Sequence, residues 1–118
     1  MEDRFLQQIK KGALELLVLA LICRQPAYGY ELLNLLAKQS GGLFALKEGT
    51  LYPILYRLED AGLIEAKWKQ GEGRTAPKKV YTATGAGEAE LKQRRILWKE
   101  FQTTVDGILD QRGFEDEQ

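Results

Sequence analysis

One stretch of the chain, residues 47–64, limits the possible folds more than any other. Its apolar residues recur at the i, i+3, i+4, i+7 spacing of a single helix face: Leu51, Ile54, Leu55 and Leu58. We therefore expect a helix from about Glu48 to Ala61. Pro53 fits within a first turn, where its missing N–H would be unpaired anyway, and Gly62 is a predicted left-handed stop.

The opposite face of this helix lacks the Lys and Glu residues that are usual on a solvated surface. It carries instead Thr50, Tyr52, Pro53, Tyr56 and Arg57. Two phenols, a hydroxyl, a proline and a guanidinium suit a surface that contacts another molecule. The pattern also fits a routine amphipathic helix whose tyrosines lie half-buried on a neighbouring element, and it leaves both readings open.

Length and composition favour one small domain without a metal or cofactor. The chain has 118 residues, of which 44% are hydrophobic. Cys23 is the single cysteine and histidine is absent, so we expect no disulfide, no zinc site and a reducing, cytoplasmic location. The formal charge is zero, but residues 67–79 carry a net +4 and residues 106–118 a net −4.

Two more helices are expected before the central stretch. The first spans about residues 3–24 and is apolar on nearly all sides from Ala13, so it needs cover on more than one side. That cover can come from its own domain or from a second subunit. The next spans about residues 28–38 and ends at Gly41 and Gly42. Together with the helix after it, it forms a helix-turn-helix pattern.

A β-hairpin is predicted after Gly62, because the hydrophobic period changes there. Residues 63–69 and 78–83 read as strands around a Gly-rich turn at 70–77. The predicted class is therefore mainly α (α+β), a winged helix-turn-helix over residues 1–83. The cations of this wing suit a phosphate backbone. The alternative is a solvated hairpin whose lysines have no binding role and only prevent aggregation at the strand edges.

A long helix is predicted over residues 84–112, with an acidic, frayed tail at 113–118. Thr84 is its expected cap, and a length of about 25 residues corresponds to roughly 37 Å. Apolar residues form a heptad seam interrupted by Arg94: Leu91, Trp98, Phe101, Val105 and Ile108. Such a seam predicts dimerisation, or packing of the helix back on the first helix of its own chain.

These residues together resemble the PadR family of transcriptional regulators, in its short-tailed branch. The segments that carry the resemblance are Tyr28-Gly29-Tyr30-Glu31-Leu32, Glu48-Gly49-Thr50-Leu51-Tyr52-Pro53, Leu55-Tyr56-Arg57-Leu58-Glu59, Gly62-Leu63-Ile64, Arg74, Lys78-Lys79-Val80-Tyr81, Thr84 and Gly87. The resemblance implies a dimeric winged-helix repressor whose terminal helices exchange contacts between subunits. It also implies, by similarity to multidrug-sensing members, that Trp98 and its symmetry mate flank a flat pore for planar aromatic compounds.

Three positions depart from that pattern. Ala83-Thr84 replaces Leu-Thr at the end of the wing, and Arg95 and Gln102 replace an aromatic and an acidic residue around Trp98. A carboxylate that would bind cations is therefore missing from the pore. The nearby arginine favours anionic aromatic ligands.

The primary hypothesis is a homodimer that binds double-stranded operator DNA. The central helix enters the major groove, while the wing reaches the backbone or the minor groove. The expected DNA-binding residues are Tyr28, Thr50, Tyr52, Pro53, Arg57, Arg74, Lys78 and Lys79. The expected effector cleft, at which a planar aromatic molecule lowers DNA affinity, is formed by Leu14, Leu17, Val18, Trp98, Phe101 and Val105. Alternatively, Trp98 only packs the dimer seam.

The two alternative classes of function are a protein-binding module and an enzyme. A winged helix that binds proteins, without a ligand, remains open because the net charge is zero. An enzyme is not expected. The chain has no histidine, no Gly-rich phosphate loop between a strand and a helix, and no Ser- or Cys-based nucleophile constellation.

Overall fold

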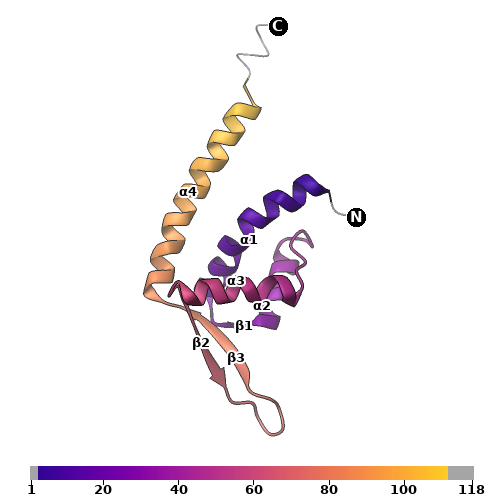
Figure 1. Ribbon diagram of the computed structural model, residues 1–118, viewed down its shortest axis with the longest axis vertical. Coiled ribbons are helices and arrows are strands. Elements are labelled where there is room, and N and C mark those ends of the chain that lie inside the picture. The colour runs from indigo at the N-terminus through magenta and orange to yellow at the C-terminus, as the bar shows by residue number, and fades with distance from the viewer. Residues whose placement is uncertain (1–2, 112–118) are drawn as a thin grey trace.

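A computed structural model describes residues 3–111 as four helices and one small antiparallel sheet (Figure 1). In chain order the elements are α1 (Arg4–Arg24), β1 (Ala27–Tyr28), α2 (Gly29–Gln39), α3 (Glu48–Asp60), β2 (Ile64–Lys69), β3 (Lys78–Ala83) and α4 (Gly85–Leu109). The mainly helical class with a long last helix is confirmed. The acidic tail predicted for residues 113–118 lies outside the described residues.

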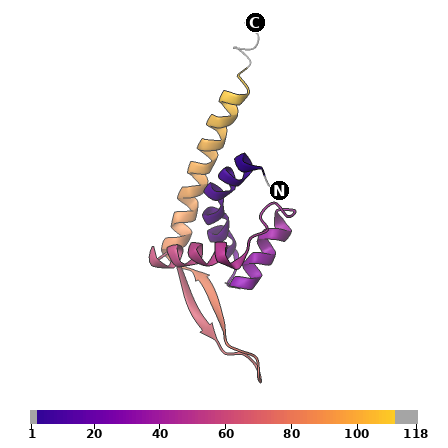
Figure 2. The same cartoon turned by 45° about the vertical axis from the view of Figure 1, so that its right-hand side comes forward.

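The elements form a head with two projections. Helices α1, α2 and α3 pack together, the β2–β3 hairpin extends from one side of them, and α4 extends from the other (Figures 1 and 2). This arrangement makes the molecule elongated, with principal extents of 71 × 36 × 20 Å. The radius of gyration is 17.8 Å, against about 13 Å for a compact domain of roughly 100 residues.

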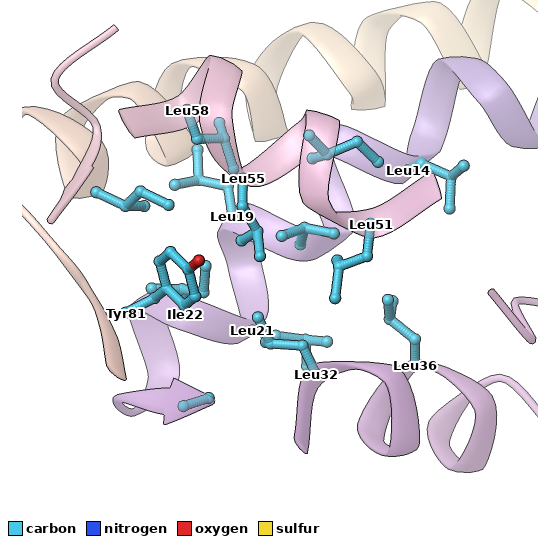
Figure 3. Close-up of a cluster of buried hydrophobic side chains, with 14 of the residues drawn as sticks. Leu14, Leu19, Leu21, Ile22, Leu32, Leu36, Leu51, Leu55, Leu58 and Tyr81 are labelled. Carbon is cyan, nitrogen blue, oxygen red and sulfur yellow. The ribbon is translucent and has the colours of Figure 1, made fainter. Parts of the chain in front are cut away.

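The hydrophobic core lies inside the head and is formed mainly by leucines from the three helices (Figure 3). Leu51, Leu55 and Leu58 of α3 are completely buried, which confirms the apolar face predicted for this helix. The other core residues labelled in Figure 3 are Leu14, Leu19, Leu21, Ile22, Leu32, Leu36 and Tyr81. Since α3 packs against the core with one face only, its opposite face remains accessible to a binding partner.

Both ends of α3 agree with the predicted helix from about Glu48 to Ala61, but the position of Pro53 within it differs from the prediction. Gly62 has φ 75°, and the N–H of Leu63 donates to the carbonyl of Leu58 at 3.0 Å, so the left-handed stop is confirmed. The placement of Pro53 in the first turn was wrong, because it is the sixth residue of the helix. Its missing N–H therefore removes the helical bond to the Gly49 carbonyl, which faces solvent with the rest of this exposed residue.

The sheet contains a strand that the sequence did not reveal. The strand order is β1-β3-β2, and β1 pairs with β3 through Ala27 opposite Tyr81 and Tyr28 opposite Val80. A two-residue strand beside Pro26 has no periodicity of its own. It forms only because it can pair with the edge of β3 that β2 leaves unpaired. This pairing places Tyr28 against the wing.

The first turn of α4 is fixed to the end of α3. The Thr84 hydroxyl donates to the Gly62 carbonyl at 2.7 Å and accepts the N–H of Gly87 at 3.0 Å, which confirms the predicted cap. Gly87 lies so close to the Leu63 carbonyl oxygen that a Cβ atom there would overlap it. The direction in which α4 leaves the head is therefore set by this contact.

Candidate nucleic-acid interface and effector groove

The exposed face of α3 presents four of the five predicted residues. Thr50, Pro53, Tyr56 and Arg57 are all exposed, Tyr56 to 55%. These side chains do not contact the core, because the apolar residues of α3 that form part of the core lie on the other side of the helix. A helix presented in this way can enter a DNA groove.

Tyr52 is the exception, because it is half-buried and serves partly as a structural residue. Its hydroxyl lies against Gly29 at the start of α2, where a Cβ atom would be only 2.6 Å away. The reading that a tyrosine of this helix lies on a neighbouring element therefore holds for Tyr52 and not for Tyr56. Glycine at position 29 is what allows α2 and α3 to approach this closely.

Tyr28 joins the start of α2 to the wing. Its backbone N–H donates to the Glu31 carboxylate at 2.9 Å, and its pairing with Val80 fixes it to β3. The Lys78 ammonium lies 4.9 Å from the centre of the Tyr28 ring. The structure thus brings together two residues predicted to contact phosphates, although they are 50 positions apart in sequence.

Lys79 connects the wing to α3. Its ammonium lies 5.8 Å from the centre of the Tyr56 ring and 5.7 Å from that of Tyr81. Burial raises the pKa of Tyr81 to about 12, and the neighbouring Tyr52, Glu59 and Tyr56 add to the rise. The phenol therefore stays neutral, and within residues 3–111 its buried hydroxyl has no hydrogen-bond partner.

The wing carries exposed cations along its strands and at its tip. Lys67, Lys69, Lys78 and Arg74 are all exposed. At the tip, the N–H of Thr75 donates to the Glu72 carbonyl at 3.0 Å, which closes a turn around Arg74. The exposed face of α3, Lys79 and the wing strands are thus contiguous, and they form the candidate nucleic-acid interface.

A second candidate site is an apolar groove of about 1370 Å³ between α1 and α4. Leu17, Trp98 and Ile96 line it, with Lys92 and Arg95 also among its lining residues. Trp98 and Phe101 lie with ring centres 6.0 Å apart. An apolar floor beside cationic groups suits an anionic aromatic molecule.

Four of the six residues predicted for the effector cleft do not line this groove. Leu14 and Val18 point into the head and belong to its core, so their assignment to the cleft was wrong. They are one helical turn apart and share the side of α1 that meets the core. Because residues 13–23 are apolar on nearly every side, periodicity could not distinguish that side from the groove side. Phe101 and Val105 lie further along α4, beyond the groove of the single chain.

Most of the predicted α4 seam is exposed. Phe101 and Ile108 are 61% and 67% exposed, and Ile96, Leu97, Trp98, Val105 and Leu109 are exposed as well. Arg94, which interrupts the seam, is held by the Glu90 carboxylate one turn away at 2.7 Å. We call the exposed apolar residues on the Phe101 side of α4 the α4 stripe: Leu97, Trp98, Phe101, Val105, Ile108 and Leu109. Among residues 3–111, no helix is long and apolar enough to cross a membrane, and no cluster of three potential metal ligands occurs.

Sequence reasoning passed over one exposed residue of the wing. Trp68 of β2 is 71% exposed and lies opposite Lys79 in the sheet. The signal was present in the sequence as an aromatic residue between Lys67 and Lys69.

The family model of PadR-like transcriptional regulators matches residues 18–93, which run from the last turns of α1 through α2, α3 and the wing to the first turns of α4. The chain belongs to this family. This PadR-like chain is accordingly a transcriptional regulator and not an enzyme.

Relatives of this PadR-like regulator share most of its length. An uncharacterized protein of Lysinibacillus sphaericus is 32% identical over 103 residues, or 86% of this chain and 93% of that protein. The crystal structure of a PadR family transcriptional regulator from Eggerthella lenta has a TM-score of 0.80 and 32% identity, and covers 90% of this chain and 89% of the other. A PadR-like regulator from Bacillus cereus has a TM-score of 0.75 and 34% identity, and covers 87% and 97%. The winged helix-turn-helix fold is thereby confirmed.

Proposed function

We propose that this PadR-like regulator binds operator DNA as a homodimer, acts as a repressor in the cytoplasm, and is released from DNA by a planar aromatic molecule. Residues 1–83 serve as the DNA-binding head and residues 84–112 as the dimerisation helix. The observation that carries the proposal is the continuous surface formed by the exposed face of α3, Lys79 and the cationic wing.

On DNA, α3 lies in the major groove with Thr50, Pro53 and the accessible edge of Tyr52 near base edges or phosphates. Tyr28 and Arg57 hold phosphates at the border of the groove. Arg74, Lys78 and Lys79 reach the backbone next to the minor groove. The close approach of Lys78 to Tyr28 supports this division, because it places the start of α2 and the wing on one side of the molecule.

Dimerisation through the α4 stripe follows from its exposure. Soluble monomers rarely leave a large contiguous apolar patch in water. Phe5 and Ile9 of α1 are 69% and 53% exposed. We propose that α1 and the α4 stripe of one subunit pack against those of the other, which leaves the two heads at opposite ends of the dimer. Two heads then read half-sites roughly 34–36 Å apart.

Charge reversal on the wing tests the DNA-binding function. In Lys78→Glu, we expect the affinity for the most enriched duplexes from a random library to fall at least about tenfold at roughly 0.1 M salt, because two cations per dimer are lost. In Lys78→Ala, the slope of log affinity against log salt should become shallower by about two, since each lost phosphate contact contributes roughly 0.9. Fluorescence anisotropy of labelled duplexes measures both quantities.

Lys38→Glu is the matched control. Lys38 lies in the last turn of α2, is exposed, and undergoes the same change of charge away from the wing. Its variant should bind duplexes like the original chain. If Lys78→Glu and Lys38→Glu weaken binding equally, or if affinity does not depend on salt, the wing does not contact DNA. A winged helix that binds proteins would then be the better account.

The proposed effector site is the groove between α1 and α4, continued by the second subunit. Trp98 is 44% exposed in the single chain, so its ring remains accessible to a flat ligand. Lys92 and Arg95 favour a carboxylate or sulfonate on that ligand. A ligand bound between the α4 helices changes the angle between the two heads and therefore lowers the affinity for DNA.

A naphthalene sulfonate dye tests the effector site. We expect saturable quenching of tryptophan emission by the dye, and a loss of dye affinity of at least about tenfold in Trp98→Ala, because stacking on both rings disappears. Trp98→Phe, which keeps an aromatic face, should retain most of the affinity. If Trp98→Ala remains a dimer and binds the dye unchanged, Trp98 only packs the seam.

A further inference from the structure

Trp68 occupies an unusual place for a large apolar residue. It lies near the outer end of β2, is 71% exposed, and makes no ring contact with any other residue in the 3–111 range. Leaving most of an indole in water forfeits the stabilisation that its burial would give. The core does not use Trp68, and neither the α4 stripe nor the effector groove includes it.

The sheet register shows which way Trp68 faces. Trp68 is directly opposite Lys79, and Ala66 is directly opposite Tyr81, so these four side chains share one face of the sheet. At the inner end of that face Tyr81 is buried in the head, and next to it Lys79 reaches the Tyr56 ring of α3. Trp68 therefore continues a row that begins on the exposed face of α3 and runs outward along the wing.

The charges around Trp68 define the chemistry of its partner. Lys79 is opposite Trp68 in β3 and shares its face of the sheet, whereas Lys67, Lys69 and Lys78 belong to the other face of the hairpin. The nearest acidic residues in sequence are Glu65 and Glu72, at the base of β2 and in the loop. An aromatic face beside Lys79, on a hairpin whose other face carries three more ammonium groups, suits a polyanion that also presents flat or apolar surfaces. Nucleic acid combines both, because phosphates alternate with sugars and bases.

We infer that Trp68 packs on the sugar–phosphate backbone between the major groove read by α3 and the minor groove reached by the wing. Its indole N–H is then available to donate to a phosphate oxygen, while Lys79 neutralises the same stretch of backbone. This role depends on the proposed DNA binding, and it adds an aromatic contact to a wing otherwise described only by its cations. Trp68 would thereby fix the distance between wing and duplex.

Two measurements test this role on the full-length chain with a duplex enriched from a random library. First, adding the duplex should shift the tryptophan emission of the original protein. The shift should disappear in Trp68→Phe, which still contains Trp98. Second, Trp68→Ala should weaken binding at least about fivefold, as expected for the loss of one aromatic contact, while Trp68→Phe retains most of the affinity. Since Trp68 is exposed, both variants should melt at the original temperature.

The outcomes separate this inference from the DNA-binding function itself. If Trp68→Ala binds as tightly as the original chain and Trp68 emission does not respond to the duplex, the inference is wrong. If Lys78→Glu still weakens binding in that case, the proposed function stands without it. If the original chain binds no duplex at all, both are wrong.

Discussion

Replacing Phe101 by glutamate is expected to convert the proposed homodimer into monomers. Phe101 is 61% exposed in the single chain and lies in the middle of the α4 stripe, next to Trp98. In a dimer both copies of Phe101→Glu would place a carboxylate in an apolar seam and would also lose the burial of two rings. We expect the dimer dissociation constant to rise roughly a thousandfold or more, which corresponds to about 4 kcal/mol. Sedimentation equilibrium measures this constant directly.

Thr103→Glu is the control for this experiment, because it adds the same carboxylate to the opposite side of α4. Thr103 is exposed and lies two residues, or about 200° of helical rotation, from Phe101. Its variant should remain dimeric and bind DNA. Phe101→Glu should also lose operator affinity, because one head alone makes half of the phosphate contacts. An unchanged dimer in Phe101→Glu would show that the α4 stripe is not the interface.

The second large effect is expected at the junction between α4 and the head. In Gly87→Ala the new Cβ atom would overlap the Leu63 carbonyl oxygen, and this backbone atom cannot rotate away as a side chain can. To relieve the overlap, α4 must shift away from the Gly62–Leu63 corner, which strains the Thr84 hydrogen bond to Gly62. We expect the free energy of unfolding to fall by about 3 kcal/mol or more, measured by urea denaturation.

Gly85→Ala is the matched control in the same turn. A Cβ atom on Gly85 meets nothing within 4 Å, and Gly85 has the negative φ of an ordinary helical residue. Alanine should therefore leave stability unchanged or raise it by up to about 1 kcal/mol, because it is the better helix former. If Gly85→Ala and Gly87→Ala have equal stability, the contact with Leu63 does not fix α4.

The parts of the fold that sequence predicted are those specified by local chemistry. Leu51, Leu55 and Leu58 define the face of α3 by their spacing, and Gly62 defines its end because a left-handed residue is needed there. The hairpin followed from the change of period after Gly62. Each of these signals lies within a few residues of the element it specifies, so no knowledge of distant neighbours was needed.

The parts that sequence could not predict depend on contacts between distant segments. Ala27 and Tyr28 become a strand only against β3, and Leu14 and Val18 belong to the core only because α1 happens to turn that side inward. In the sequence, Tyr52 resembles the other residues of its helix face, and only the structure shows that it packs against Gly29. The pairing of Trp68 with Lys79 likewise requires the register of the sheet.

In the proposed complex, two heads held apart by paired α4 helices read one duplex together. Hydroxyl-radical footprinting on an enriched duplex, with the number of bound chains determined in the same complex, tests it most directly. We predict two chains per duplex and two protected segments one helical turn apart, about 10 to 10.5 base pairs between their centres. One bound chain with a single protected segment would contradict this arrangement.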